Sequence, residues 1–225
     1  MEQKQMPVSR NLEENIRVYK QIFADCADIK MREMKLGKKQ EIGCFVAYIE
    51  VTGGETIFER SLIGKLLNSL SDCTAEEIWE RLETNALGLS DATPFATMEE
   101  AADGMLTGDT ILFVDGFNRA LKIPDKGYPQ MGISEAESEK TIRGSNEGFT
   151  ESVKSNTALI RKRLRSPKVK IKEIKAGVRS KTNVDLVYIE DLVYPGVLEE
   201  AERRLSRYEI DGVLDSGIKI GRAHV

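Results

Sequence analysis

Amphipathic helical segments and β-prone runs alternate along this chain of 225 residues, and their order is the strongest constraint on its fold. The run Cys44–Val51 is almost wholly apolar, which is typical of a strand buried on both faces. Asp115-Gly116 separates two further β-prone runs and predicts a hairpin turn, since these residues tolerate a positive φ. Helices interleaved with strands and a hairpin predict an α/β or mixed α+β fold with a mixed sheet.

Capping residues mark where several helices begin. Asn11 is a favourable N-cap for the first helix. Thr74 and Glu77 have the spacing of a capping box, and Trp79 in the helix that follows is expected to pack in the core. The expected helices are 11–27, 56–70, 74–81, 98–105, 152–165 and 196–208, and the expected strands are 29–36, 44–51, 109–114, 119–123, 169–174, 184–190 and 210–214.

Glycine and proline gather in residues 124–150, which predicts a crossover between lobes or a functional loop. We therefore expect an N-terminal α/β lobe over residues 1–128 and a C-terminal α/β lobe over residues 129–220. The last five residues, GRAHV at 221–225, look like a cloning scar and are set aside. No sequence repeat of fixed period is found, although each half has a helix, then β-prone runs, then another helix.

The composition argues against several classes of site. The single histidine, His224, lies in the terminal scar, so neither a His-based triad nor a His-ligated metal site is expected. The three cysteines lack CxxC spacing, which predicts reduced thiols rather than a disulfide framework or a zinc site. No apolar run approaches the ~18 residues of a membrane span, and the first ten residues lack the apolar core of a signal peptide.

No catalytic constellation is found among the acidic and hydroxyl residues. Asp109 and Asp115 stand at opposite ends of an apolar strand, so they are not expected to share a proton. Ser152 and Lys154 belong to neither a GxSxG nor an SxxK motif, which favours a helix-start role for the serine. An enzymatic function is therefore the weakest of the hypotheses.

Residues 141–165 combine small, polar and basic side chains around Gly144 and Gly148. The helix that follows is expected to have its apolar stripe at positions 153, 157, 160 and 164. Residues 151–181 carry 11 Lys or Arg against 2 Asp or Glu, a net charge of +9, so the rest of the chain carries −13 of the total of −4. Without interleaved aromatic residues, a solvated or subunit-facing surface is favoured over nucleic-acid binding, with an anionic membrane surface between the two.

Longer motifs carry a resemblance to one family. The runs RGSNEGFTESVKSNTALIRKRLRSPKVKI, GVRSKTNVDLVYIEDLVYP and EEAERRLSRYEIDGVLDSG are similar to the N-terminal domain of the A subunit of GerA-type spore germinant receptors. The upstream runs NLEENIRVYKQIFADCADIKMREM and GDTILFVDGFNRALKI match the same pattern. The resemblance extends from about residue 11 to residue 218.

The resemblance implies a fold, a location and partners. The fold would be two small α/β lobes with mixed sheets, separated by a cleft. The chain would be a soluble fragment, on the cytoplasmic (core) side, of a protein that continues into the spore inner membrane. Its partners would be the B and C subunits, other A subunits and a small nutrient, an amino acid or a sugar. No cofactor, metal or nucleic acid is implied.

Two roles stay open. The first is a non-enzymatic receptor domain that takes part in nutrient sensing and couples the signal to the membrane region. The second is a structural oligomerisation module, in which Arg161, Arg163 and Arg165 meet the acidic surface of a neighbouring subunit while the nutrient binds elsewhere. The candidate ligand-binding or subunit-interface residues are Arg143, Glu147, Thr150, Glu151, Asn156 and Arg161.

Overall fold

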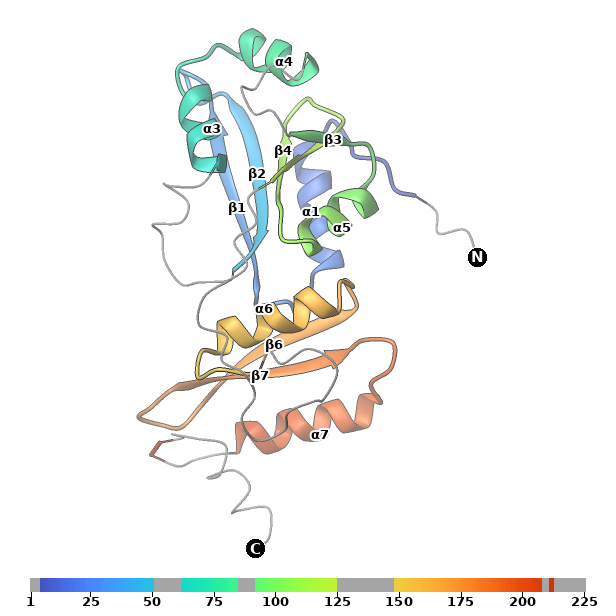
Figure 1. Cartoon of the computed structure of the whole chain (residues 1–225), viewed down its shortest axis with the longest axis vertical. Helices are drawn as coiled ribbons and strands as arrows, with labels where there is room; N and C mark the ends of the chain where they lie inside the picture. The colour runs from blue at the N-terminus through green and yellow to red at the C-terminus, as the bar shows by residue number, and fades with distance from the viewer. Residues whose placement is uncertain (1–4, 51–61, 85–91, 125–147, 208–210, 213–225) are drawn as a thin grey trace, which may run out of the picture. The chain divides into compact units, whose positions relative to one another are not determined.

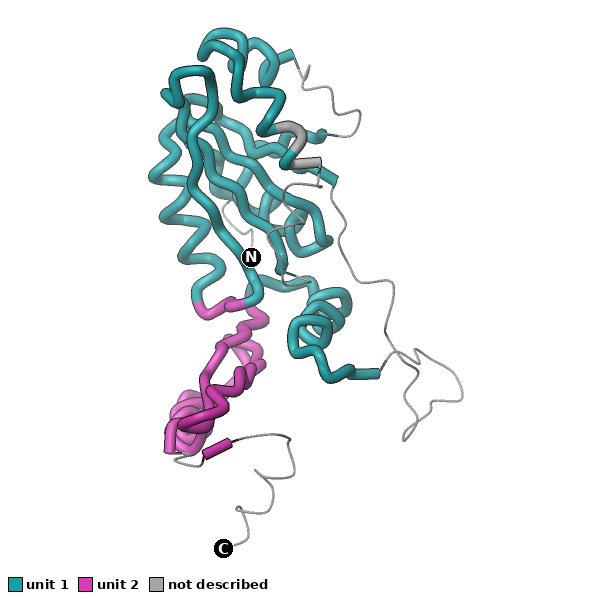
Figure 2. The backbone as a smooth tube through the Cα atoms, turned by 90° about the vertical axis from the view of Figure 1, so that its left-hand side faces the viewer, with its two compact units in different colours: residues 1–24, 28–167 teal, residues 25–27, 168–225 magenta. Residues whose placement is uncertain are grey.

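Two compact units make up the protein in a computed structural model that describes residues 5–50, 62–84, 92–124, 148–207 and 211–212. Unit 1 comprises residues 1–24 and 28–167, and unit 2 comprises residues 25–27 and 168–225 (Figure 2). The chain therefore passes between the units three times, after residues 24, 27 and 167. The lobe boundary that we expected at residue 128 falls within 125–147, outside the described residues.

A five-stranded sheet with the order β1-β2-β4-β5-β3 forms the centre of unit 1 (Figure 1). The combination of helices and strands is confirmed, but these strands pair only antiparallel rather than in a mixed sheet. Short turns join β1 to β2 and β4 to β5, and a short turn can join only antiparallel neighbours. The strands are β1 (Ile29–Leu36), β2 (Ile42–Ile49), β3 (Thr93–Phe95), β4 (Thr110–Val114) and β5 (Ala120–Ile123).

Helices cover both faces of this sheet. On one face, Tyr19 of α1 packs against Phe45 and Phe113, with ring centroids 6.1 and 5.2 Å apart, and its hydroxyl donates to Ala101 O of α5. On the other face, Leu70 and other residues of α3 and α4 pack against the opposite side chains of β2 and β4. The helices in the described part of unit 1 are α1 (Leu12–Ile22), α3 (Leu62–Leu70), α4 (Ala75–Glu83), α5 (Met98–Leu106) and α6 (Val153–Arg163).

The predicted caps are confirmed. Asn11 accepts hydrogen bonds from the backbone N–H groups of Glu13 and Glu14, and Thr74 forms a capping box with Glu77. The first helix is shorter than expected, because it ends at Ile22 instead of extending to residue 27. Residues 25–27 leave the helix through a left-handed residue at position 25, with φ 56°, and lie beside a strand of unit 2.

Trp79 does not pack in the core as we expected; it is 41% exposed. Its neighbours Ile78 and Leu82 are buried, and a residue one position along a helix points about 100° away from that inward face. The indole instead lies against Gly116 of the β4–β5 turn, and its Nε1 donates to Asp115 O at 3.2 Å. Gly116 has φ +81°, so the turn needs both its conformation and its missing side chain.

The described residues of unit 2 form a two-stranded antiparallel sheet and one helix. The strands are β6 (Val169–Ala176) and β7 (Thr182–Ile189), and the helix is α7 (Pro195–Ser206), which begins at the expected proline (Figure 1). Residues 25–27 lie along β6, because Ala27 N donates to Ile171 O at 2.8 Å and Ile171 N donates to Asp25 O at 2.9 Å. Among its described elements, neither β7 nor α7 has a fully buried residue, whereas Val169, Ile171 and Ala176 of β6 are buried.

Candidate functional site

The predicted functional segment enters the described structure at Gly148 and forms the start of α6. Ser152 is the N-cap, and its Oγ accepts a hydrogen bond from Ser155 N at 3.3 Å. Thr150 Oγ1 in turn accepts from Ser152 N at 3.2 Å. Ser152 therefore has the helix-start role that the sequence favoured.

Thr150 and Asn156 are two candidate residues that the structure brings together. Asn156 Oδ1 accepts from Thr150 N at 2.7 Å, and Asn156 Nδ2 donates to Thr150 O at 2.7 Å. These bonds use the amide oxygen and one of the two amide protons of Asn156 within the chain itself. The pair therefore fixes the turn before α6, and most of its hydrogen-bonding capacity is not offered to a ligand.

The other candidates near this turn are placed differently. Glu151 is exposed and lies one residue before the N-cap. Arg143 and Glu147 lie outside the described residues, so their roles stay predictions.

Arg161 is completely buried, and it forms a two-pronged ion pair with Asp28. Its Nε donates to Asp28 Oδ2 at 2.7 Å and its Nη2 donates to Asp28 Oδ1 at 3.1 Å. The side chains are 0% and 2% exposed. Because the guanidinium has no exposed surface, it cannot also meet a neighbouring subunit in this conformation. Exposed basic residues that could do so are Arg163, at the end of α6, and Arg165, two residues after it.

The Arg161 guanidinium also holds together two of the places where the chain leaves unit 1. Asp28 is the first residue of unit 1 after the 25–27 segment, and Ser166, whose carbonyl accepts from Arg161 Nη1 at 3.1 Å, is the second-last before residue 168. A buried charge is stable only when it is paired, so losing either partner would leave the other uncompensated. Arg161 therefore joins Asp28 to Ser166 within unit 1, close in sequence to two of the points where the chain leaves that unit.

A second ion cluster ties α6 to β2 through Glu50. Lys154 Nζ and Lys30 Nζ lie 2.6 and 3.0 Å from its two carboxylate oxygens. Burial alone would raise the pKa of Glu50, but the hydrogen bonds from Lys154 and Lys30 outweigh burial and hold the pKa below its ordinary value. The carboxylate therefore stays charged and anchors the start of α6.

Asp28 and Glu50 are the residues that sequence reasoning missed. Both stand beside β-prone runs, and nothing in the local pattern links Asp28 to Arg161, which follows it by 133 positions. Only a signal that links distant positions in the chain, such as their joint variation among related sequences, could have found this pair.

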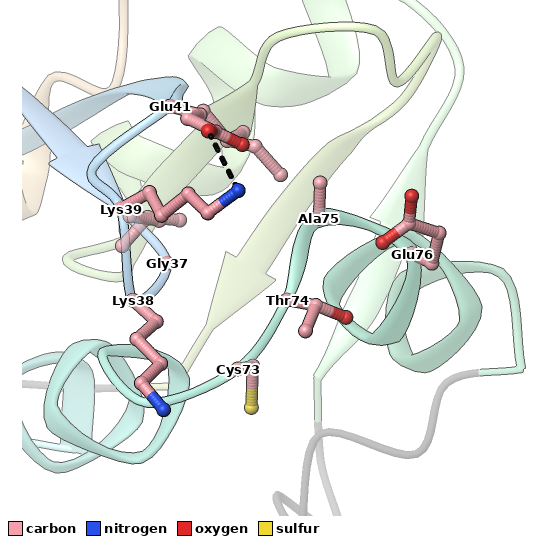
Figure 3. Close-up of a pocket in the computed structure, with 10 residues that line it drawn as sticks. Gly37, Lys38, Lys39, Glu41, Cys73, Thr74, Ala75 and Glu76 are labelled. Carbon is pink, nitrogen blue, oxygen red and sulfur yellow. Dashed lines mark ion pairs between the residues drawn. The ribbon is translucent and has the colours of Figure 1, made fainter.

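A shallow pocket lies at one end of unit 1, between the β1–β2 turn and the start of α4 (Figure 3). Its volume is about 190 Å³, below the 300–1,000 Å³ that is typical of small-molecule sites. Lys39 points toward Glu41, with 3.7 Å between Nζ and Oε1, and Thr74 Oγ1 is used in the capping box. A second pocket shares Leu36, Gly37 and Lys38 with it. Its small volume makes this pocket a weak candidate for a small-molecule site.

Nothing in the described ranges combines into a reactive or metal-binding centre. No three His, Cys, Asp or Glu residues of the described chain lie close enough to hold a metal ion. Cys26, Cys44 and Cys73 are buried and form no disulfide with one another, and burial raises the pKa of Cys44 to about 12. At neutral pH this thiol is protonated, which makes it a poor nucleophile.

Within the described ranges, no helix has both the length and the apolarity needed to cross a membrane.

Comparisons with known proteins agree over nearly the whole chain. Residues 17–223 match the family described as Bacillus/Clostridium GerA spore germination protein. The chain is 36% identical over 212 residues to an uncharacterized membrane protein, YfkQ, of Bacillus subtilis, and 29% identical over 218 residues to spore germination protein KA of the same organism. These alignments cover 94% and 96% of this chain but 40% of each relative, so the chain spans about two fifths of their length.

The fold is also similar to that of a solved structure. It is the crystal structure of the N-terminal domain of the A subunit of the Bacillus megaterium spore germinant receptor GerK3. The match has a TM-score of 0.68 at 23% sequence identity and covers 93% of this chain and 75% of that domain.

Proposed function

Because this chain belongs to the GerA family of spore germination proteins, we propose that it is a domain of a germinant receptor A subunit, where it takes part in nutrient sensing and passes the signal toward the membrane region. The observation that carries this proposal is the connection between the two units. Three chain passages join them, and a single buried guanidinium, Arg161, binds the backbone or side chain beside two of these passages. A displacement at the start of α6 would thereby reach the links to unit 2.

No chemical step is part of this proposal. The relatives are named as spore germination proteins or as a membrane protein rather than as enzymes. In the whole protein, the domain would lie at the spore inner membrane, on the core side, with the B and C subunits and other A subunits as partners.

The nutrient would contact the segment that leads into α6. In this proposal Arg143 and Glu147 offer opposite charges to the carboxylate and ammonium groups of an amino acid, or hydrogen bonds to a sugar. The Thr150–Asn156 pair supports them by holding the turn in one conformation. Exposed Glu151 would be a further polar contact.

A chemical-shift titration of the 225-residue chain with L-alanine and with glucose at millimolar concentrations tests this ligand site. We expect shifts for amides between residues 143 and 161 with at least one nutrient class, and none with the D-enantiomer of the active one. No shift in that segment with any amino acid or sugar would overturn the ligand site, while the family assignment would stand.

The second candidate role, assembly of the receptor, is favoured by the exposed basic residues at the end of α6. Arg163 and Arg165 are exposed, whereas Arg161 is buried. Replacing Arg163 and Arg165 with Glu in the full-length protein is therefore expected to weaken assembly without unfolding the domain. Receptor size in mild detergent measures this, and wild-type assembly in the double variant would exclude this surface as the interface.

The cellular role is tested by deleting the gene and measuring the loss of optical density of spores after addition of nutrients. We expect a reduced response to at least one nutrient and its recovery when the intact gene is restored. A wild-type response of the deletion strain to a full panel of amino acids and sugars would contradict the proposed function.

A further inference from the structure

The described elements contain a helix–hairpin repeat. An 11-residue helix followed by two 8-residue antiparallel strands occurs first as α1, β1 and β2 and again as α6, β6 and β7. The second set follows the first by 140 or 141 positions. The turns between the strands also match, since Gly37 and Gly177 have φ 87° and 85°.

The two helices begin in the same way, bond for bond. Before α1, Asn15 Oδ1 accepts from Ser9 N at 2.9 Å and Asn15 Nδ2 donates to Ser9 O at 2.7 Å. Before α6, Asn156 makes the same two bonds to Thr150, at 2.7 Å each. In both turns the hydroxyl of the Ser or Thr also accepts from the N–H of the N-cap residue two positions on.

The two hairpins close in the same way. Glu50 N donates to Asp28 O at 2.7 Å, and Glu190 N donates to Lys168 O at 2.9 Å. The strands of both hairpins pair in the same register over eight positions. Each residue of α6 therefore has a structural counterpart 141 positions earlier, in α1.

The apolar positions of α1 are buried, whereas their counterparts on α6 are exposed. Val8, Leu12 and Phe23 are buried, and their counterparts Phe149, Val153 and Leu164 are 69%, 37% and 47% exposed. Apolar side chains that gather on one exposed face are typical of an interaction surface. In the second repeat, α6 thus leaves exposed the positions with which α1 packs into the core of unit 1.

Positive charge lies beside this apolar face. Arg163 and Arg165 are exposed on either side of Leu164 in the sequence, and the one acidic residue of the run 148–165, Glu151, lies at the other end of the helix. We call Phe149, Val153, Leu164, Arg163 and Arg165 the α6 surface. A protein partner of this surface needs apolar side chains together with carboxylates.

Helix α4 offers these two features on its outward face. Glu76, Trp79, Glu80 and Glu83 recur at helical spacing, opposite the buried face of the helix, and all four are exposed. Within the described part of the chain, no cation forms an ion pair with the three carboxylates. Like charges three or four positions apart destabilise a helix, and exposed tryptophan is typical of binding surfaces. We call these four residues the α4 surface.

The two surfaces lie at opposite ends of unit 1 (Figure 1). Helix α6 is bonded to Asp28 and Glu50, at one end of the β1–β2 hairpin. Helix α4 begins at the other end, beside the turn where Lys38 N donates to Cys73 O at 2.9 Å. The eight residues of β1 separate these ends by roughly 26 Å. The two surfaces of one copy therefore cannot meet each other.

We propose that the α6 surface of one copy of this chain binds the α4 surface of a second copy. Leu164 and Val153 would cover the partner's Trp79, and Arg163 and Arg165 would offset the repulsion among the partner's carboxylates. The contact is head-to-tail, because each copy uses a different surface toward each of its neighbours. This inference rests on the assembly role proposed above and names the surface that the basic end of α6 meets.

Trp79 is the single tryptophan of the chain, so it reports the contact directly. We expect sedimentation equilibrium of the 225-residue chain to show species larger than a monomer as its concentration rises to about 1 mM, a range that includes the weak affinity of a small interface. Over the same range the emission of Trp79 should move to shorter wavelengths. A chain that stays monomeric up to that concentration would overturn the proposal.

A pair of matched variants locates the contact. Leu164→Glu places a charge in the α6 surface and is expected to abolish self-association. Val197→Glu changes an exposed apolar residue of α7, outside both surfaces, and is expected to leave self-association unchanged. An equal loss in the two variants, or a loss in Val197→Glu alone, would contradict the α6 surface as the site of contact.

Charge reversal on each surface tests which two surfaces meet. Glu80→Arg and Arg165→Glu are each expected to weaken self-association about 10-fold, because like charges then face each other. In an equimolar mixture, each reversed surface meets its opposite charge on the other variant, so association should return toward that of the wild type. Recovery also shows that both variants are folded. A mixture that associates no better than either variant alone would overturn the pairing of α4 with α6.

The outcome for the assembly role is separable from these results. If the chain does not self-associate, yet replacing Arg163 and Arg165 with Glu still reduces receptor size in mild detergent, assembly through α6 stands with another partner. The pairing of α6 with α4 is then overturned.

Discussion

The two helix–hairpin repeats start from the same local structure and end in different surroundings. In the first, β2 lies inside a five-stranded sheet with helices on both faces; in the second, β7 pairs with β6 among the described strands and has no fully buried residue. The caps, turns and strand register are alike, so local signals are sufficient to form the hairpin twice. The two repeats differ in how far other parts of the chain cover them. The contribution of a residue to the free energy of unfolding therefore depends on its burial rather than on the hairpin geometry that the repeats share.

The largest expected difference between the repeats is in the stability that equivalent positions of β2 and β7 contribute. Phe45 is fully buried against Tyr19 and Phe113, so Phe45→Ala is expected to lower the free energy of unfolding of unit 1 by about 3–5 kcal/mol. Its counterpart Asp185 lies in unit 2, and Asp185→Ala should leave unit 1 unchanged. Urea unfolding followed by fluorescence of Trp79, the single tryptophan, reports unit 1. Equal decreases of the urea midpoint in both variants would contradict the difference in burial between Phe45 and Asp185.

The ninth residue of the repeated helix gives the next contrast. It is Arg161 in α6, buried against Asp28, and Lys20 in α1, whose ion pair with Glu33 is exposed on both sides. Arg161→Ala leaves the Asp28 carboxylate buried and unpaired, which is expected to cost about 3 kcal/mol. Lys20→Ala should change stability by about 0.5 kcal/mol or less. Urea unfolding followed by Trp79 fluorescence measures the free energy of unfolding of both variants. Similar losses of stability would contradict the difference in burial between the two ion pairs.

The matched asparagines before the two helices should differ less. Asn15 is fully buried and Asn156 is half-buried, although their hydrogen bonds are the same. Asn15→Ala leaves buried backbone groups of Ser9 without partners and is expected to cost about 2 kcal/mol, whereas Asn156→Ala is expected to cost about 1 kcal/mol. Urea unfolding gives the stabilities. A larger loss of stability in Asn156→Ala than in Asn15→Ala would mean that the turn before α6 stabilises the fold in some way beyond starting the helix.

The smallest expected effect concerns the ion cluster that joins α6 to Glu50. Since the folded protein holds the pKa of Glu50 below its ordinary value of 4.5, the cluster stabilises the fold fully above about pH 4.5. That contribution is lost as the pH falls through the lower pKa of the folded state. Lys154→Met should therefore be less stable than the wild type by under about 1 kcal/mol at pH 7, with the gap closing toward pH 3. Lys38→Met, at an exposed position, should show no such closing gap in the same urea experiment.

Features that depend on neighbouring residues were predicted well from sequence. Strand Ile29–Leu36, the caps at Asn11 and Thr74, and the proline start of α7 follow from period, capping and turn chemistry, which act over a few positions. The turn at Asp115-Gly116 joins its two strands for the same reason.

Features that depend on distant partners were not predicted. The apolar stripe expected on α6 is wrong at both ends, since Val153 and Leu164 are exposed, while Arg161 is buried. Arg161 can face inward because its ion pair with Asp28 compensates the buried charge. The hydrophobic periodicity of a helix does not report such a pairing. The order of elements raised the possibility of two related lobes, but no sequence repeat was found. The helix–hairpin repeat is alike in hydrogen bonds and register, while the equivalent side chains Phe45 and Asp185 share no chemistry.

The short segment 25–27 imposes an order on folding. It belongs to the start of the chain, yet its backbone bonds are to Ile171 of β6, so closing them joins points almost 150 residues apart. Contacts between such distant positions form slowly, because the intervening chain must first give up its freedom. Unit 1 can assemble mostly from contacts within itself, and its Arg161–Asp28 pair brings the two ends of that loop together. We therefore expect unit 1 to form before residues 25–27 pair with β6.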